Sequence, residues 1–175
     1  MAKLQTRRLL LQPCQASDRA DFIALEADPE VMRFLNGGHP VAGETVDPDA
    51  GFLQPRGGEP HVWTVRHVAD GGFVGWLCLW PETGGQAELG YRFHRGEWGR
   101  GLASEAAAVL IDWGFREAGY TRIFACTNAG NHASRRVMAK IGMTPLCTDA
   151  PDWLDPPAAL PGQEVWYDLR RPADL

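Results

Sequence analysis

A glycine-rich turn that leads into a long apolar helix is the segment of this sequence best suited to bind a ligand. The residues WGRGLAS (98–104) follow the predicted strand AELGYRFH and open a helix predicted over 102–118. Glycine lets the backbone turn tightly, so consecutive N–H groups can point into one concavity, and the first helical turn adds unpaired donors and the positive end of the helix dipole. Such an arrangement can bind phosphate or pyrophosphate, although the same glycines also suit a plain strand-to-helix turn.

Two common phosphate-binding motifs do not match this turn. A P-loop has the pattern GxxxxGK[ST], and no Lys-Ser or Lys-Thr pair follows these glycines. A dinucleotide-binding turn has the pattern GxGxxG/A, but here Ser104 occupies the third glycine position, and the next strand, TRIFACTN, offers no acidic residue for a ribose. The sequence therefore disfavours a nucleotide-binding domain.

Three polar residues elsewhere could have either a functional or a purely structural role. Asn131 and Ser134 lie at the start of a helix predicted through SRRVMAKI, where an asparagine can simply cap the helix. Glu88 lies on the strand AELGYRFH, where a carboxylate could take a proton from an amine or pair with a neighbouring arginine. The residue types alone leave both interpretations of each position open.

Hydrophobic periodicity and turn signals predict the elements that position these residues. Helices are expected after an N-cap at Ser17, after Asp28-Pro29, over 102–118, and from Ser134 to Gly142. Strands are expected at TRRLLLQ (6–12), HVWTVRHV (61–68), FVGWLCLW (73–80), AELGYRFH (87–94), TRIFACT (121–127), MTPLCT (143–148) and EVWYDLRR (164–171). Antiparallel hairpins followed by alternating strands and helices predict an α/β (α+β) fold with a mixed sheet of about seven strands.

The composition is that of a globular chain, and we expect one domain over residues 1–175. Hydrophobic residues make up 45% and charged residues 22%, and the net charge of -5 argues against a nucleic-acid partner. No apolar run approaches the ~18 residues of a membrane helix, which argues against a membrane partner. The four cysteines form no CxxC pair and no secretory signal is visible, so we expect a cytoplasmic protein without a metal site.

Several segments taken together resemble the GNAT N-acetyltransferases. These are WGRGLASEA after AELGYRFH, and NHASRRVMAKIGM about thirty residues later. The N-terminal stretches TRRLLLQP and SDRADFIALEADPEVMRFLNG are similar to one branch of that family, the ribosomal-protein alanine acetyltransferases RimJ and RimL. The resemblance implies a mostly antiparallel sheet with helices on both faces and a splay between the fourth and fifth strands. It does not extend over residues 40–60 and 149–163.

The resemblance also implies a site for acetyl-CoA. The family's loop pattern, Q/R-x-x-G-x-G/A, falls on Trp98, Gly101 and Ala103, with Trp98 in place of the usual Gln or Arg. The pantetheine arm would lie in the splay beside the main chain of Tyr91 and Phe93, with the Phe93 N–H bound to the acetyl carbonyl. The pyrophosphate would lie over the main-chain amides of Gly99, Arg100, Gly101, Leu102, Ala103 and Ser104.

The remaining roles implied by the resemblance are chemical. Asn131 would contact the CoA arm, Ser134 would donate a proton to the departing thiolate, and Glu88 would relay the proton of the acceptor amine. The implied reaction transfers acetyl from acetyl-CoA to a primary amine, either a protein N-terminus or a small molecule, by direct attack in a ternary complex without a metal. The alternative is a non-catalytic acyl-CoA-binding or regulatory module on the same fold. Either a monomer or a homodimer is expected.

Overall fold

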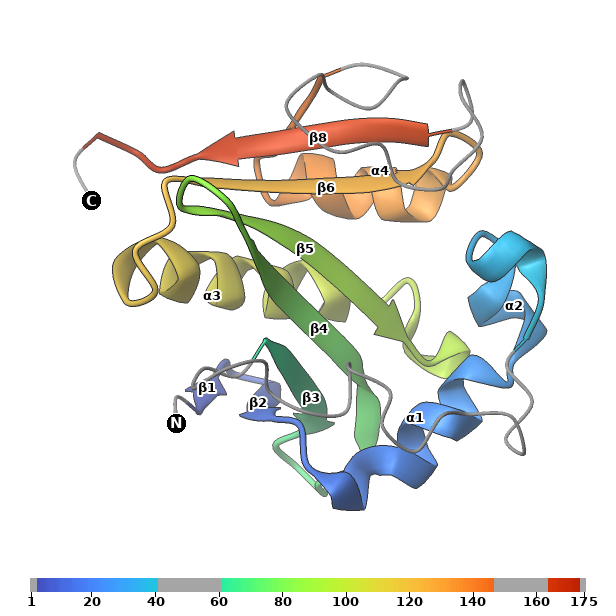
Figure 1. The fold of residues 1–175 in the computed structure, drawn as a ribbon. Coiled ribbons are helices and arrows are strands. Elements are labelled where there is room, and N and C mark those ends of the chain that lie inside the picture. Colours follow the sequence, from blue (N-terminus) through green and yellow to red (C-terminus); the bar gives the residue numbers. More distant parts are fainter. Residues whose placement is uncertain (1–2, 41–60, 147–163, 174–175) are drawn as a thin grey trace.

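The computed structural model describes residues 3–40, 61–146 and 164–173, whose strands form one mixed sheet (Figure 1). The order along the eight-stranded sheet is β1-β2-β3-β4-β5-β6-β8-β7, and only the neighbours β5 and β6 are parallel. The strands are β1 (Leu4–Gln5), β2 (Leu9–Pro13), β3 (Val62–His67), β4 (Phe73–Glu82), β5 (Gln86–Phe93), β6 (Arg122–Asn128), β7 (Thr144–Pro145) and β8 (Glu164–Arg170). The predicted α/β (α+β) class with a mostly antiparallel sheet is confirmed.

The sheet has one strand more than the seven expected, because β1 lies before the predicted segment 6–12, of which only residues 9–12 are strand, as part of β2. β1 and β2 flank a turn in which the Thr6 N–H donates to the Leu9 carbonyl over 2.8 Å. In return, the Leu9 N–H donates to Thr6 Oγ1 over 2.9 Å. A threonine hydroxyl that accepts a main-chain N–H closes such a turn locally, and a run of apolar residues does not reveal it.

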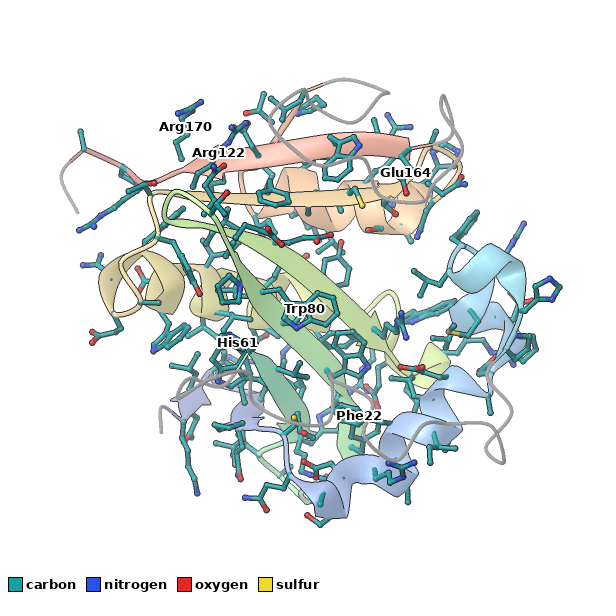
Figure 2. The ribbon with its side chains drawn as sticks, in the orientation of Figure 1. Phe22, His61, Trp80, Arg122, Glu164 and Arg170 are labelled. Atoms are coloured by element: carbon teal, nitrogen blue, oxygen red, sulfur yellow. The ribbon has the colours of Figure 1, made fainter. Side chains whose placement is uncertain are left out.

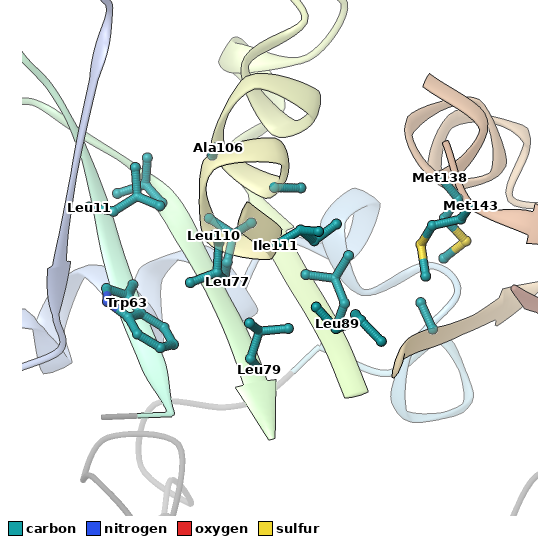
Figure 3. Packing of buried hydrophobic residues seen from close by; sticks show 14 of the residues in the cluster. Leu11, Trp63, Leu77, Leu79, Leu89, Ala106, Leu110, Ile111, Met138 and Met143 are labelled. Atoms are coloured by element: carbon teal, nitrogen blue, oxygen red, sulfur yellow. The ribbon is translucent and has the colours of Figure 1, made fainter. Parts of the chain in front are cut away.

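Helices cover both faces of the sheet, as expected. α3 (Leu102–Arg116) and α4 (His132–Lys140) pack on one face, where Leu110 and Met138 join the core that includes Leu77 and Leu89 (Figure 3). α1 (Arg19–Glu26) and α2 (Pro29–Met32) lie on the other face over a second cluster that contains Trp76 and Cys78. Successive residues of β4 therefore belong to different cores, as the alternation of a strand requires.

The helix boundaries test the predicted caps. The Asp28 side chain accepts a hydrogen bond from the Glu30 N–H over 2.9 Å and α2 begins at Pro29, so this start is confirmed. The Ser17 cap is wrong, because Ser17 lies inside a 3-10 turn, Ala16–Asp18, that leads directly into α1. The strand predicted over 143–148 is shorter in the structure, where β7 holds two residues, and Cys147 and Thr148 lie outside the described residues.

β5 and β6 are paired only where they begin. Their register joins Gln86 to Arg122, Ala87 to Ile123 and Glu88 to Phe124. Beyond those pairs the two strands diverge, with β5 running toward α2 while β6 stays beside β8 (Figure 1). We call this divergence the splay; it comprises residues 89–93 of β5 and 125–128 of β6. It lies between the strands predicted as fourth and fifth. Within the described ranges, no helix is long and apolar enough to cross a membrane.

Candidate active site

The main chain of β5 presents hydrogen-bonding groups to the splay. The His94 N–H donates to the Val74 carbonyl of β4 over 2.9 Å. Because N–H groups alternate along a strand, the N–H of Phe93 points the opposite way, toward the side on which β6 diverges. Tyr91, two residues earlier, presents its N–H to the same side. This edge of β5 can therefore pair with an extended ligand, as the resemblance implies.

The Tyr91 side chain reaches from the splayed part of β5 to the first turn of α4. Its hydroxyl lies 2.7 Å from Ser134 Oγ and donates to the Ser134 carbonyl over 3.2 Å, joining residues 43 apart in the chain. Burial raises the pKa of Tyr91 to about 12, so the phenol is neutral at physiological pH. A neutral hydroxyl that both donates and accepts can fix the orientation of the serine hydroxyl.

Asn131 caps α4. Its Oδ1 accepts a hydrogen bond from the Ser134 N–H over 3.2 Å, so the capping interpretation is confirmed. Because Oδ1 makes this bond, the Nδ2 group still offers N–H donors for another contact. The contact of Asn131 with the CoA arm stays a prediction.

The glycine-rich turn has the geometry expected of an anion site. Gly99 and Gly101 have φ angles of 74° and 75°, in the left-handed region that favours glycine. Gly101 is the N-cap of α3, and no side chain in the described part of the chain caps that end. The first amides of α3, those of Leu102, Ala103 and Ser104, are therefore left for water or a ligand. The Leu102 side chain is only 1% exposed, so this residue offers its amide alone.

Charged side chains hold the turn in place. Arg100 pairs with Glu97, which also contacts His67 of β3 over 3.1 Å. The Arg100 side chain therefore makes a structural contact within the turn. Its main-chain amide remains part of the turn.

Trp98 connects the turn to the end of β5. Its indole N–H donates to the Phe93 carbonyl over 2.8 Å, while the side chain as a whole is 46% exposed. From the sequence, Trp98 is only a departure from the family's loop pattern, and its contact with Phe93 was not predicted. A tryptophan five residues after the end of a strand can bring its indole N–H back to that strand end. Whether it does so depends on the path of the intervening turn.

Glu88 lies on the opposite face of the sheet from Tyr91. It is the register partner of Trp80, and the Cys126 Sγ lies 3.9 Å from its Oε1 (Figure 2 shows Trp80 over β4 and Glu164 at the start of β8). Burial raises the pKa of Glu88, and the carboxylates of Glu82 and Glu164 raise it further. The alternative of an arginine partner is not observed among the described residues, where the contact of Glu88 is the thiol of Cys126.

Comparisons with known proteins show the family of the chain. The model of the acetyltransferase (GNAT) domain matches residues 8–144. The chain belongs to the GNAT acetyltransferase family. An FsC-acetyl coenzyme A-N(2)-transacetylase of Aspergillus fumigatus is 31% identical over 178 residues, which cover 96% of this chain and 76% of that protein. The chain is thus an acetyl-CoA-dependent N-acetyltransferase.

Solved structures show the same fold for this acetyltransferase. A GNAT-family acetyltransferase of Bacillus anthracis superposes with a TM-score of 0.77 at 24% identity, covering 97% of this chain and 99% of that one. A ribosomal-protein-S5-alanine acetyltransferase of Vibrio fischeri superposes with a TM-score of 0.73 at 13% identity, covering 99% and 98%. At such identities the likeness concerns the fold alone. The GNAT fold expected from the resemblance is confirmed.

Proposed function

We propose that this acetyltransferase transfers the acetyl group directly to a primary amine in a ternary complex, with Ser134 as the proton donor to the thiolate of CoA. The observation that carries the proposal is the 2.7 Å contact between Tyr91 and Ser134 beside the splay. Acetyl-CoA supplies an activated acyl group on a thiol that can leave.

Tyr91 and Ser134 form a directed pair of hydroxyls in this proposal. The phenol has one proton, which can go to the Ser134 carbonyl or to Ser134 Oγ. When it turns from the carbonyl to Oγ, the serine proton is released from Tyr91 and can point toward the departing sulfur. Because the Tyr91 pKa is raised to about 12, the phenol holds its own proton while it orients the serine. Ser134 thus gives its proton to the sulfur as the C–S bond breaks.

The main-chain amides carry the other interactions with the donor. The Phe93 N–H stabilises the oxyanion that develops on the acetyl carbonyl, and Trp98 holds the Phe93 carbonyl at 2.8 Å. The pyrophosphate binds at the amides of Gly99–Ser104, supported by the uncapped start of α3. Asn131 offers Nδ2 to the pantetheine arm.

Glu88 serves the acceptor on the other face of the sheet. An alkylamine arrives mainly as an ammonium ion at neutral pH, so it must lose a proton before it attacks. Glu88 takes that proton directly or through water, and its raised pKa makes it a better base than an exposed glutamate. The neutral amine then attacks and forms the C–N bond while the C–S bond breaks, and Ser134 protonates the sulfur. The second proton that the nitrogen loses returns through water to Ser134, so the reaction balances.

Two classes of acceptor follow from the comparisons and the sequence. The name of the Aspergillus fumigatus relative describes transfer to an N(2) nitrogen of FsC, which favours an amine outside the ribosome. The resemblance to the RimJ and RimL branch favours a protein N-terminus, and solved structures named as ribosomal-protein acetyltransferases share the fold. The amine of an FsC-like or other small molecule is therefore our first candidate for the acceptor, and a protein N-terminus is the second.

An acceptor screen tests the proposal. CoA thiol release from acetyl-CoA would be followed with small-molecule amines, polyamines, aminoglycosides and peptides that begin with alanine, each against a buffer without amine. We expect release that depends on one class of amine, with acetylated product of matching mass. Binding of acetyl-CoA without amine-dependent release across the panel would contradict the proposed reaction and favour the non-catalytic acyl-CoA module.

A further inference from the structure

We propose that Arg8 is a positioning residue for acetyl-CoA, which holds the glycine-rich turn and balances the charge of Glu105 at the start of α3. This inference rests on the proposed binding of pyrophosphate at that turn. Arg8 lies between β1 and β2, in a part of the chain to which neither the sequence nor the resemblance gave a function.

The contacts of Arg8 join two parts of the turn. Its Nε donates to Glu105 Oε2 over 2.7 Å, and its Nη2 lies 2.6 Å from the same oxygen. Its Nη1 donates to the Arg100 carbonyl over 3.1 Å. One guanidinium thus fixes the peptide before Gly101 and the first turn of the helix after it. A planar group with several N–H donors suits this role better than a lysine would.

The charge of Glu105 makes the arginine necessary. Glu105 lies in the first turn of α3, close to the helix end that would bind the pyrophosphate. Burial alone would raise the pKa of Glu105, but hydrogen bonds from Thr6 and Arg8 outweigh it and lower the pKa, so the carboxylate is ionised at neutral pH. An unbalanced carboxylate there would repel the phosphates and offset the favourable helix dipole.

The guanidinium also lies beside the turn itself. A Cβ placed on Gly101 would lie 3.9 Å from Arg8 Nη2, so the positive charge borders the N-cap of α3. The Arg8 side chain is 40% exposed and the Glu105 side chain 23%. The pair is therefore positioned at the surface of the turn, where it acts on an approaching anion, and not deep in the core.

The experiment measures acetyl-CoA affinity by calorimetry, steady-state kinetics and the melting temperature for Arg8→Gln, Glu105→Gln and the double variant. We expect Arg8→Gln to raise the acetyl-CoA Kd and KM about tenfold while kcat stays within about twofold. Adding Glu105→Gln removes the unbalanced carboxylate, so the double variant should recover most of that affinity. Arg8→Lys, which keeps the charge, should give an intermediate Kd.

Arg116→Gln is the matched control. Arg116 is the last residue of α3, at the end of the helix away from the turn, and its side chain pairs with Asp112 at 2.7 Å. We expect its Kd to equal that of the wild type. A purely structural role of Arg8 would lower the melting temperature of the variants and leave the Kd of the folded protein unchanged, which would overturn the inference. Absence of recovery in the double variant would also overturn it.

The wild type separates this inference from the proposed function. If the wild-type protein binds acetyl-CoA and Arg8→Gln binds it equally well, only the role of Arg8 fails. If the wild type itself does not bind acetyl-CoA, the proposed function fails first.

Discussion

Glu88 and Tyr91 lie three residues apart on β5 and project from opposite faces of the sheet. Tyr91 contacts Ser134 of α4 on one face, while Glu88 contacts Cys126 on the other. The proposed proton donor for the thiolate and the proposed base for the amine are therefore separated by the sheet. In the proposed reaction the donor and the acceptor would therefore reach the acetyl group from opposite sides of the sheet.

Ser134→Ala should lower kcat about tenfold to a hundredfold, because the departing thiolate loses its proton donor. The low end of the range for general acid catalysis is expected, since a CoA thiolate is already a fair leaving group. The acetyl-CoA dissociation constant should stay within a few-fold of the wild type. Single-turnover kinetics and calorimetry on one preparation check both, and an unchanged kcat would remove Ser134 from the mechanism.

Tyr91→Phe keeps the ring and removes the hydroxyl that contacts Ser134. We expect a smaller loss of kcat than for Ser134→Ala, because the serine remains but is no longer oriented. The double variant should be no slower than Ser134→Ala alone, since the phenol acts through the serine. Fully additive losses in the double-mutant cycle would show that the two hydroxyls act independently.

Glu88→Gln should abolish the acidic limb of the pH profile of kcat/KM. The raised pKa of Glu88 places that limb above the usual glutamate range, and activity falls as the pH drops through it because the base becomes protonated. Glu164→Gln, which removes a neighbouring carboxylate, should shift the limb to lower pH. A limb that is the same in wild type and Glu88→Gln would assign the base to another group.

Glu88→Gln also tests the stability of the fold. A folded-state pKa above the unfolded value stabilises the fold below the unfolded pKa, and this contribution is lost as the pH rises through the folded pKa. Above the folded-state pKa the ionised Glu88 is therefore unfavourable where it is buried. We expect Glu88→Gln to melt higher than the wild type above that pKa, with the difference shrinking as the pH falls through it.

Gly101→Val should greatly weaken acetyl-CoA binding. A β-branched residue at a φ of 75° is strained by roughly 1–2 kcal/mol, and its side chain would crowd the phosphate approach. Gly96→Ala is the control, because a Cβ at Gly96 meets nothing within 4 Å. Calorimetric titration of both folded variants decides the matter, and an unchanged Kd for Gly101→Val would place the phosphates elsewhere.

Trp98→Phe keeps an aromatic side chain and removes the N–H that bonds the Phe93 carbonyl. Because Phe93 supplies the proposed oxyanion donor, kcat should fall several-fold while the acetyl-CoA Kd changes less. Trp113→Phe on α3, where the ring packs on Trp63 of β3, serves as the control for loss of an indole elsewhere. A change in Kd alone would make Trp98 part of the phosphate-binding turn and not of the oxyanion site.

Local signals in the sequence predicted most of the fold. Asp28 followed by proline gave the correct start of α2, and the helix predicted over 102–118 matches α3 to within two residues at its end. These signals act between residues that are close in the chain. Thr6 shows their limit, because its hydroxyl closes the turn between β1 and β2, and nothing in the apolar pattern of 6–12 indicates that turn.

The candidate site was predicted residue by residue but not as a set of contacts. Ser134 and Glu88 were chosen for their chemistry, whereas their partners, Tyr91 and Cys126, lie 43 and 38 residues away. Such pairs depend on which strands become neighbours and on the face each residue takes. The role of Arg8 was missed for the same reason, since its partner Glu105 is 97 residues distant.

The short pairing of β5 with β6 also makes the sheet mechanically uneven. Main-chain bonds hold the N-terminal five strands together and the C-terminal three together, but few cross the boundary. α3 bridges this boundary: a Cβ on its Gly114 would meet Leu79 of β4 at 2.8 Å and Ile123 of β6 at 3.2 Å. Because Gly114 has no side chain, α3 packs closely against both parts of the sheet and connects them. A ligand paired with the free edge of β5 would add a further connection between these two parts.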